Sequence, residues 1–192
     1  MPQEQELLRQ AQSFDMRALA EIYDLYSPKL YRYAMRFLGD ASAAEDCVAE
    51  TFSRFLQALR AGKGPRDYLQ AYLFRTAHNI VVDHYRRQPP VDELDDDLPD
   101  GGNVEEIASR SLNQQRVRAA LRQLTEEQQQ VVALKFLEGW ENEEIARALR
   151  KPVGAVKSLQ HRAVARLQKI LLDEDDHETR QSTRPAFSRP VG

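Results

Sequence analysis

Side chains near residue 160 combine the residue types and the spacing that contact with nucleic acid requires. Lys157, Ser158, His161 and Arg162 follow one another at spacings of one, three and four residues, and Arg166 lies one turn further on. In a helix this spacing places all five side chains on one side. Such a row of polar and cationic groups suits phosphates and base edges in a major groove. We therefore predict that this side of the helix binds DNA.

The segments around this row have the pattern of a helix-turn-helix. Residues 143–149 form one predicted helix, residues 154–163 form the second, and about four residues from Arg150 to Val153 turn the chain between them. Small Ala146 lets the two helices approach closely. The apolar residues that pack between them are Ile145, Leu149, Val156 and Leu159. The alternative interpretation is an ordinary amphipathic helix with its basic residues in solvent.

Charge is distributed unevenly along the chain. The net charge is +1 for residues 1–87, −8 for residues 88–106, +6 for residues 107–172 and −2 for residues 173–192, within a total of −3. Local charge decides what a surface attracts, so the basic block is where nucleic acid is expected. Because this block contains the helix-turn-helix pattern, the charge favours DNA binding over the ordinary amphipathic helix.

Helical spacing of apolar residues also organises the first 87 residues. Asp15 is a predicted N-cap, Ser27-Pro28 is predicted to break and restart the helix, and Gly39 is predicted to end it. Asp40 or Ser42 begins the next helix. A Gly-Lys-Gly-Pro loop then precedes a fourth helix from about Asp67 to Arg87, which must stop before two prolines.

The remainder of the chain divides into three predicted segments. Residues 88–103 are acidic and rich in proline, which predicts a flexible linker. Residues 104–172 regain helical spacing, with Thr125 and Gln128 as a predicted capping box. Residues 173–192 are polar and are expected to be a disordered tail. The predicted fold class is all-α, with two small helical domains joined by the acidic linker.

Composition excludes several classes of function. The single cysteine, Cys47, cannot form an intramolecular disulfide or a thiolate zinc cluster, and it is expected to be a small buried apolar residue. The chain has neither a leader-like segment at its start nor a run long enough to span a membrane. We therefore expect a cytoplasmic protein without a metal, a cofactor or membrane insertion.

Two sets of motifs resemble the sigma-70 family of RNA polymerase sigma factors. Residues 124–163 resemble region 4 of that family, with Glu-Gly, Glu-Glu-Ile-Ala and Val-Lys-Ser in order. Residues 30–34, 38–40, 44–46, 50–52 and 72–87 resemble region 2. No room remains between them for a region 3 domain, so the chain resembles the extracytoplasmic-function (ECF) group. The resemblance implies a region 2-like four-helix domain over residues 1–87 and a region 4-like helix-turn-helix domain over residues 104–172.

The resemblance also implies partners and roles. A member of this family binds core RNA polymerase, directs it to promoter DNA and helps to open the DNA. The implied polymerase-docking residues on the helix from Ala44 to Leu59 are Asp46, Glu50 and Phe52. For Phe52 we favour packing in the core, whereas the two carboxylates can pair with polymerase arginines. An anti-sigma factor is a further partner implied by analogy, and it could sit between the two domains.

The promoter contacts implied by the resemblance fall into two sets. The upstream, minus-thirty-five element is assigned to Gly154, Lys157, Ser158, His161, Arg162 and Arg166. The downstream, minus-ten element, with its melting, is assigned to Lys63, Arg66, Tyr68, Asn79, Arg86 and Arg87. Either Tyr68 or Tyr72 could stack on a base, although Tyr72 lies on the apolar stripe and is more consistent with core packing. The eight carboxylates of residues 88–106, six of them in the linker, suit either a basic polymerase channel or a solvated spacer.

Other classes of function are weighed against this one. A helix-turn-helix regulator that binds operator DNA without joining polymerase would need a receiver or ligand-binding domain, and residues 1–87 show no such pattern. An enzyme would have to use His78, Asp83 and His84, whose spacing does not predict a shared site. A pure scaffold would leave the cationic helix without a purpose.

Overall fold

The computed structural model describes residues 2–87 and 104–182, and among these residues it contains helices and turns but no strand. This confirms the predicted all-α fold class. The predicted acidic linker, residues 88–103, and residues 183–192 of the predicted tail lie outside the described residues. Within the described residues, no helix is long and apolar enough to cross a bilayer.

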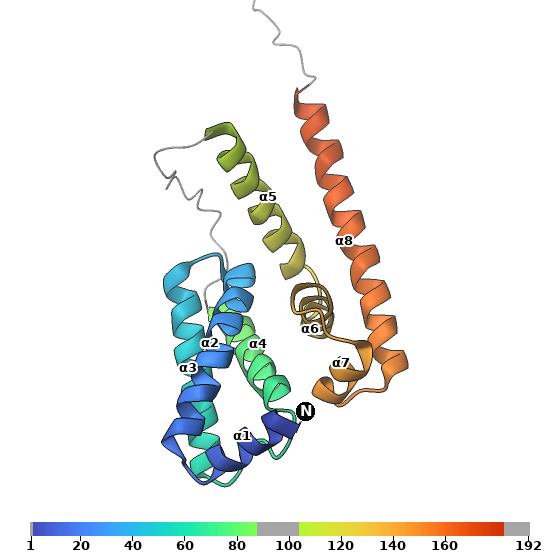
Figure 1. The fold of residues 1–192 in the computed structure, drawn as a ribbon. Coiled ribbons are helices and arrows are strands. Elements are labelled where there is room, and N and C mark those ends of the chain that lie inside the picture. Colours follow the sequence, from blue (N-terminus) through green and yellow to red (C-terminus); the bar gives the residue numbers. More distant parts are fainter. Residues whose placement is uncertain (1, 88–103, 183–192) are drawn as a thin grey trace, which may run out of the picture.

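The first half of the chain is a bundle of four helices. The bounds are α1 Pro2–Gln12, α2 Met16–Leu38, α3 Ala41–Arg60 and α4 Leu69–Arg87. Helices α2, α3 and α4 pack against one another, and α1 crosses one end of them (Figure 1). Two hydrogen bonds fix α1 there: Gln12 donates to the Pro65 carbonyl over 2.9 Å, and Glu4 accepts from the Gln70 backbone over 2.9 Å.

Helix ends in this half are set by the residues predicted to cap them. The Asp15 carboxylate accepts from the backbone N–H groups of Arg17 and Ala18, and Asp40 accepts from that of Ala43. Gly39 ends α2 in the left-handed region, with φ 75°, a conformation that costs glycine least. These three predictions are confirmed.

The prediction that Ser27-Pro28 breaks the helix is wrong, because α2 runs through Pro28 without interruption. A proline inside a helix costs about 3 kcal/mol. Leu30, Tyr33 and Phe37, which lie beyond it, are almost fully buried. Each such side chain contributes about 1.5–3 kcal/mol when it leaves water, so continuing the buried stripe outweighs the cost of the proline.

The second half is built around the C-terminal helix. Its elements are α5 Val104–Arg122, α6 Glu126–Val132, the π-helical segment η1 Ala133–Leu137, α7 Asn142–Leu149 and α8 Val153–Ser182. Helices α5, α6 and α7 all pack against α8. Helix α6 begins with the predicted capping box of Thr125 and Gln128, which is confirmed. Helix α8 continues past residue 172, where we expected a tail to begin, because the first helix-breaking residue after it is Pro185.

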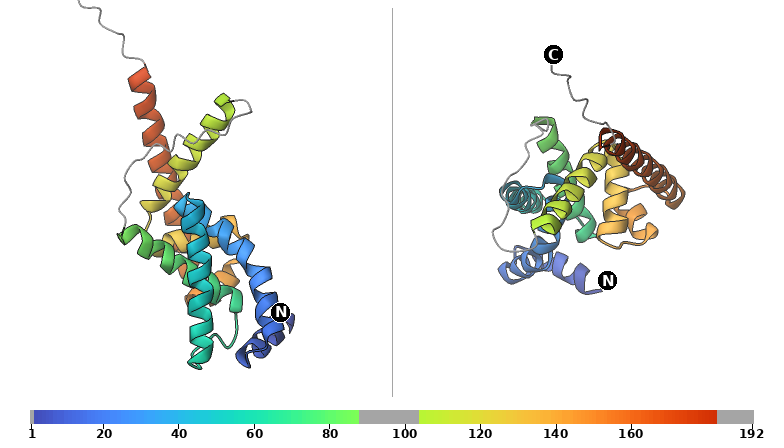
Figure 2. Two further views of the ribbon diagram at one scale, coloured as in Figure 1. Left: turned by 90° about the vertical axis from the view of Figure 1, so that its left-hand side faces the viewer. Right: turned by 90° about the horizontal axis from the view of Figure 1, so that it is seen from above.

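The two halves pack against each other and share one continuous apolar core. Helix α4 lies against α6 and α7, and α2 lies against α5, so that α5 and α8 project beyond the first half (Figures 1 and 2). At the centre, the Phe74 and Trp140 rings are 5.7 Å apart in an edge-to-face arrangement. This packing joins residues far apart in the sequence, and nothing in the sequence pattern predicted it.

Candidate nucleic-acid and polymerase interfaces

Helices α7 and α8 form the predicted helix-turn-helix. Ile145, Val156 and Leu159 are buried between them, and Ala146 lies at their close approach. The turn begins at Arg150, which adopts the left-handed conformation with φ 54° and ψ 44° as the C-cap of α7. Arginine must therefore hold a conformation that glycine adopts at lower cost.

The cationic row lies on the solvent side of α8. Gly154, Lys157, Ser158, His161, Arg162 and Arg166 are all exposed. The Arg162 Nε donates to the Ser158 carbonyl over 3.3 Å, and the Arg166 Nε donates to the Gln123 carbonyl over 3.0 Å. Nothing stands within 4 Å of a Cβ placed on Gly154, so the backbone at the start of α8 is open to a phosphate. The structure thus brings the six residues of the upstream set together on one accessible face.

The downstream set is divided between two places. Lys63, Arg66 and Tyr68 lie together on the exposed loop between α3 and α4, where they line one cleft. Asn79, Arg86 and Arg87 are exposed on α4, and Arg86 makes ion pairs with Asp83 and with Glu126 of α6. The pair with Glu126 joins the two halves, but both side chains are exposed, so it adds little to the stability that the shared apolar core provides.

Tyr68 and Tyr72 differ in how much of the ring is free. Tyr68 is 48% exposed, its backbone has φ 50°, and the Arg147 guanidinium stands 5.5 Å from the ring centre. Tyr72 is half-buried, with its ring 6.0 Å from that of Phe55. Tyr68 is therefore the better placed of the two for stacking on a base.

Of the three candidate polymerase-docking residues on α3, two lie on the surface and one lies in the core. Asp46 is exposed, and Glu50 is exposed with an ion pair to Arg54 at 2.7 Å. Phe52 is 8% exposed and packs against the Tyr23 ring at 4.8 Å, as the core interpretation expected. Sequence reasoning missed that Tyr23, the ring packed on Phe52, is itself 49% exposed. The residue lies at the edge of the apolar stripe of α2, where helical spacing alone does not decide burial.

The three residues of the enzyme alternative do not converge. His78 is buried, with its Nδ1 2.8 Å from the Tyr33 hydroxyl, and burial lowers the pKa of His78 to about 4. Asp83 is 3.9 Å from Arg86, and the His84 ring faces Tyr85. In the part of the chain that the structure describes, no group of three or more His, Cys, Asp or Glu side chains could hold a metal ion. Cys47 is buried, as expected, and burial raises the pKa of its thiol to about 11.

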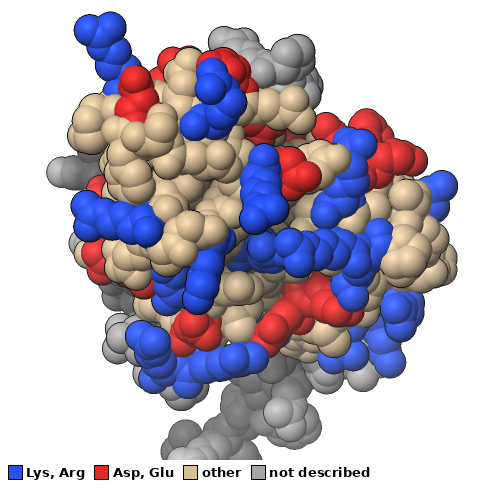
Figure 3. Space-filling model, turned by 90° about the horizontal axis from the view of Figure 1, so that it is seen from below, with Lys and Arg blue, Asp and Glu red and all other residues tan. Residues whose placement is uncertain are grey.

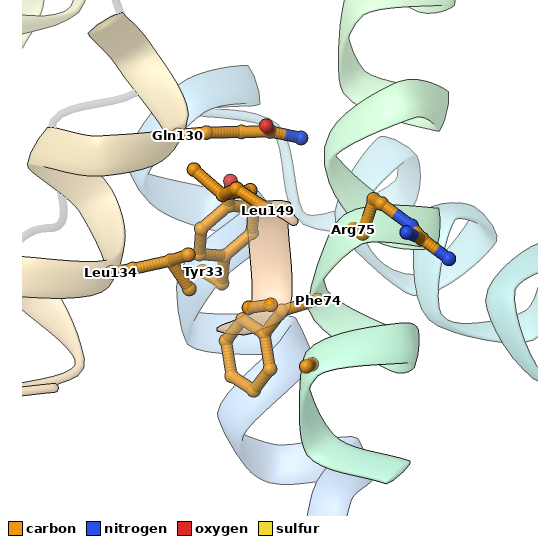
Figure 4. Close-up of a pocket in the computed structure, with 8 residues that line it drawn as sticks. Tyr33, Phe74, Arg75, Gln130, Leu134 and Leu149 are labelled. Atoms are coloured by element: carbon orange, nitrogen blue, oxygen red, sulfur yellow. The ribbon is translucent and has the colours of Figure 1, made fainter. Parts of the chain in front are cut away.

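Side chains of the two halves pack against each other between the candidate DNA-binding and polymerase-binding surfaces. Figure 4 shows Tyr33 and Phe74 of the first half facing Leu134 and Leu149 of the second, while Arg75 points away from them. This seam leaves no room for a water molecule. The Arg122 guanidinium lies 5.4 Å from the centre of the Tyr85 ring, and the Tyr85 hydroxyl donates to the Phe37 carbonyl.

Comparison with known proteins matches both halves. Residues 22–89 match the family model described as Sigma-70 region 2, and residues 114–167 match Sigma-70, region 4. The chain is 34% identical to the ECF RNA polymerase sigma factor BldN of Streptomyces coelicolor, over 88% of this chain and 66% of BldN. It is 30% identical to SigX of Bacillus subtilis, over 85% of this chain and 90% of SigX. The chain therefore belongs to the sigma-70 family of RNA polymerase sigma factors, in its ECF group.

Two solved structures have the same fold. CnrH, in its complex with the cytosolic domain of CnrY, superposes with a TM-score of 0.66 and 28% identity, over 89% of this chain and 97% of CnrH. The sigma factor RpoE of Bartonella quintana, in complex with the anti-sigma factor NepR, has a TM-score of 0.56 and 22% identity, over 79% of this chain and 95% of RpoE. At this identity, the comparison with RpoE shows only that the two chains share a fold. Members of the family are transcription initiation factors.

Proposed function

We propose that this sigma factor binds core RNA polymerase in the cytoplasm, directs it to a class of promoters and helps to open them. The observation that carries the proposal is the exposed cationic row on α8, in a chain whose other half matches region 2. Residues 1–87 act as the polymerase-binding and minus-ten domain, and residues 104–172 act as the minus-thirty-five domain. The chain contributes binding and positioning, and the polymerase supplies the catalysis.

The docking surface for polymerase is the exposed side of α3. Asp46 and Glu50 present carboxylates to solvent, where they can accept charge-assisted hydrogen bonds from arginines. Glu50 first has to exchange its Arg54 partner, which is an exposed pair and so of little stability. Phe52 supports this surface from the core rather than by direct contact.

The upstream element is read by α8 in the major groove. Lys157 and Arg162 meet phosphates or base edges, Ser158 and His161 supply hydrogen bonds, and the backbone at Gly154 approaches a phosphate. Arg166 is held toward Gln123 and contacts the DNA backbone beyond the base-reading part of the helix. Phosphate contacts fix the position of the helix, and base contacts select the sequence.

The downstream element is held by the loop before α4 and by the exposed side of α4. Lys63 and Arg66 pair with phosphates, Tyr68 stacks on an unpaired base, and Asn79 hydrogen-bonds a base or backbone. Arg86 and Arg87 extend the cationic surface. Because Arg86 is paired with Glu126 of α6 and the loop lines a cleft against α7, the two halves separate when DNA engages the whole set.

The proposal includes one further protein partner, an anti-sigma factor. An anti-sigma factor binds this chain and keeps it from polymerase, a proposal supported by CnrH and RpoE, which were solved with CnrY and with NepR.

The acidic linker either lies in a basic polymerase channel or acts as a spacer. Neutralising Asp92, Asp95, Asp96, Asp97 and Asp100 to asparagine weakens polymerase binding only if the channel interpretation is correct.

The proposal is tested by footprinting the complex of this protein with core polymerase on a promoter. Lys157→Ala with Arg162→Ala is expected to remove protection at the upstream element and leave binding to core polymerase intact. Asn79→Ala is expected to retain that protection and lower permanganate reactivity of the melted bases. Protection of DNA by the protein alone, with no affinity for core polymerase, would instead support the operator-binding regulator.

A further inference from the structure

A cleft between the two halves has the composition of an anion-binding site. We propose that it binds a compact ligand carrying two or more phosphate groups, such as a nucleoside triphosphate or an inorganic tripolyphosphate, and that this ligand holds the two halves together. The recognised chemistry is the chain of phosphates, which both molecules share. Nothing in the promoter-binding role requires such a ligand.

The cleft has the volume of a small-molecule site, about 430 Å³. One wall is the loop from Gly62 to Tyr68 with the first turns of α4, and the other wall is α7 with the turn after it. The two walls come from different halves of the chain, so the cleft exists only while the halves are packed. A cleft of this volume matches a ligand of the size of a nucleotide rather than a nucleic-acid duplex.

The lining is strongly cationic. Five cations, Lys63, Arg66, Arg75, Arg147 and Arg150, surround the cleft with a single carboxylate, Asp67. Among the described residues, none of the five takes part in an ion pair, whereas Arg54, Arg86, Lys135 and Lys151 do. Basic side chains gather across this underside of the molecule (Figure 3). Cations lining a concave surface attract anions and repel one another, so a polyanion relieves the repulsion.

An aromatic ring at the rim extends this chemistry to nucleotides. Tyr68 has a positive φ of 50°, a conformation uncommon for a bulky residue, and its ring is about half exposed beside the cleft. The Arg147 guanidinium already stands over this ring at 5.5 Å. A base can stack on the same ring while its phosphates reach the cations.

Ligand binding and domain packing are linked in this arrangement. A ligand that binds only the packed state stabilises that state by a free energy that grows with the logarithm of the ligand concentration divided by the dissociation constant. Lys63, Arg66 and Tyr68 also belong to the proposed minus-ten set, so an occupied cleft competes with promoter DNA. This regulatory consequence rests on the proposed function, whereas binding to the isolated protein does not.

The test is calorimetric titration of the full chain with sodium tripolyphosphate and, separately, with ATP. We expect one site per chain, competition between the two ligands and weaker binding at higher salt. In Arg147→Gln with Arg150→Asn, affinity for both ligands is expected to fall at least tenfold; asparagine tolerates the left-handed conformation at position 150. The control, Arg17→Gln with Lys169→Gln, removes the same charge from exposed positions outside the cleft and is expected to bind as the unmodified chain does.

A second readout follows the packing of the halves. Trp140 is the only tryptophan and lies against Phe74, so its fluorescence reports on their contact. Tripolyphosphate is expected to raise the denaturant midpoint of the Trp140 transition in the control and not in the cleft variant. Equal affinity in the two variants, or binding of adenosine without phosphates at the same strength, would overturn the proposal. These measurements use no polymerase, so failure of the sigma-factor role would appear separately, in the footprinting.

Discussion

At the scale of single residues, His78 shows how burial constrains a side chain that would otherwise titrate near neutrality. Tyr33 and Phe37 surround the ring, and the Tyr33 hydroxyl lies 2.8 Å from Nδ1. Burial lowers the pKa of His78 to about 4, and the backbone of Glu126 in the second half opposes this shift. The neutral imidazole is therefore part of the core where the two halves meet.

Stability is expected to fall with acidification because of His78. Its pKa is lower in the fold than in the unfolded chain, so the unfolded chain binds more protons between pH 6.5 and about pH 4. Between pH 7.5 and pH 5 the free energy of unfolding should drop by about 2 kcal/mol from this group. Urea unfolding of the unmodified chain and of His78→Asn at both pH values measures the effect. An equal pH dependence in the two proteins would assign the loss to other groups.

Lys157 is expected to act on DNA through charge rather than sequence. Its ammonium group is exposed on the open face of α8, where a phosphate can reach it. Lys157→Ala should weaken binding of the holoenzyme to all promoters by a similar factor and reduce the slope of log affinity against log salt by about 1. Binding titrations at several salt concentrations measure that slope, with Lys169→Ala as the control on the same helix. A change confined to some promoter sequences would mean that Lys157 reads bases.

At the scale of elements, the turn of the helix-turn-helix holds a strained residue. Arg150 ends α7 with φ 54°, and helices that end in this left-handed conformation usually have glycine at that position. Arg150→Gly should raise the free energy of unfolding by about 1 kcal/mol relative to Arg150→Ala, which removes the same charge but keeps the strain. Thermal or urea unfolding of the two variants gives the difference directly. Equal stability would show that the turn relaxes around a non-glycine residue.

Local sequence signals predicted where helices begin and end more accurately than they predicted where a helix is interrupted. Asp15, Gly39, Asp40 and the Thr125–Gln128 box set helix ends as expected, because each cap depends on residues within one turn of it. Pro28 does not break α2, because burial further along the helix outweighs a local penalty. Helix α1 was not predicted, since its place depends on contacts with the loop before α4 and with the first turn of α4.

A candidate site could likewise be predicted where its residues are close in the sequence, and not where they are distant. Spacing within one helix placed Lys157, Ser158, His161, Arg162 and Arg166 on one side, and the structure leaves all five exposed. The cleft was not predicted, because Lys63 and Arg66 are more than eighty residues from Arg147 and Arg150 in the sequence and meet only through the packing of the two halves. Phe74 and Trp140 bring those halves together, and an apolar pattern does not specify which distant partner a side chain contacts.

At the scale of the whole molecule, function is expected to require separation of the two halves. Arg86 and Glu126 form an ion pair across the seam, and Cys47 is buried away from reagents. Joining Arg86→Cys and Glu126→Cys with a short, reducible bifunctional thiol reagent should hold the halves together and abolish promoter-dependent transcription. Reduction of the linkage should restore it. Full activity of the cross-linked protein would show that DNA reaches both sets of residues without separation.

The most direct test of the sigma-factor role is transcription by purified core polymerase on fragmented genomic DNA of the source organism, with and without this protein. Every new RNA start is mapped, and the Lys157→Ala with Arg162→Ala variant is assayed in parallel. We expect new starts that share two spaced upstream motifs, and we expect the variant to lose them while still binding core polymerase. Binding to DNA without affinity for core polymerase, and with no new starts, would contradict the account.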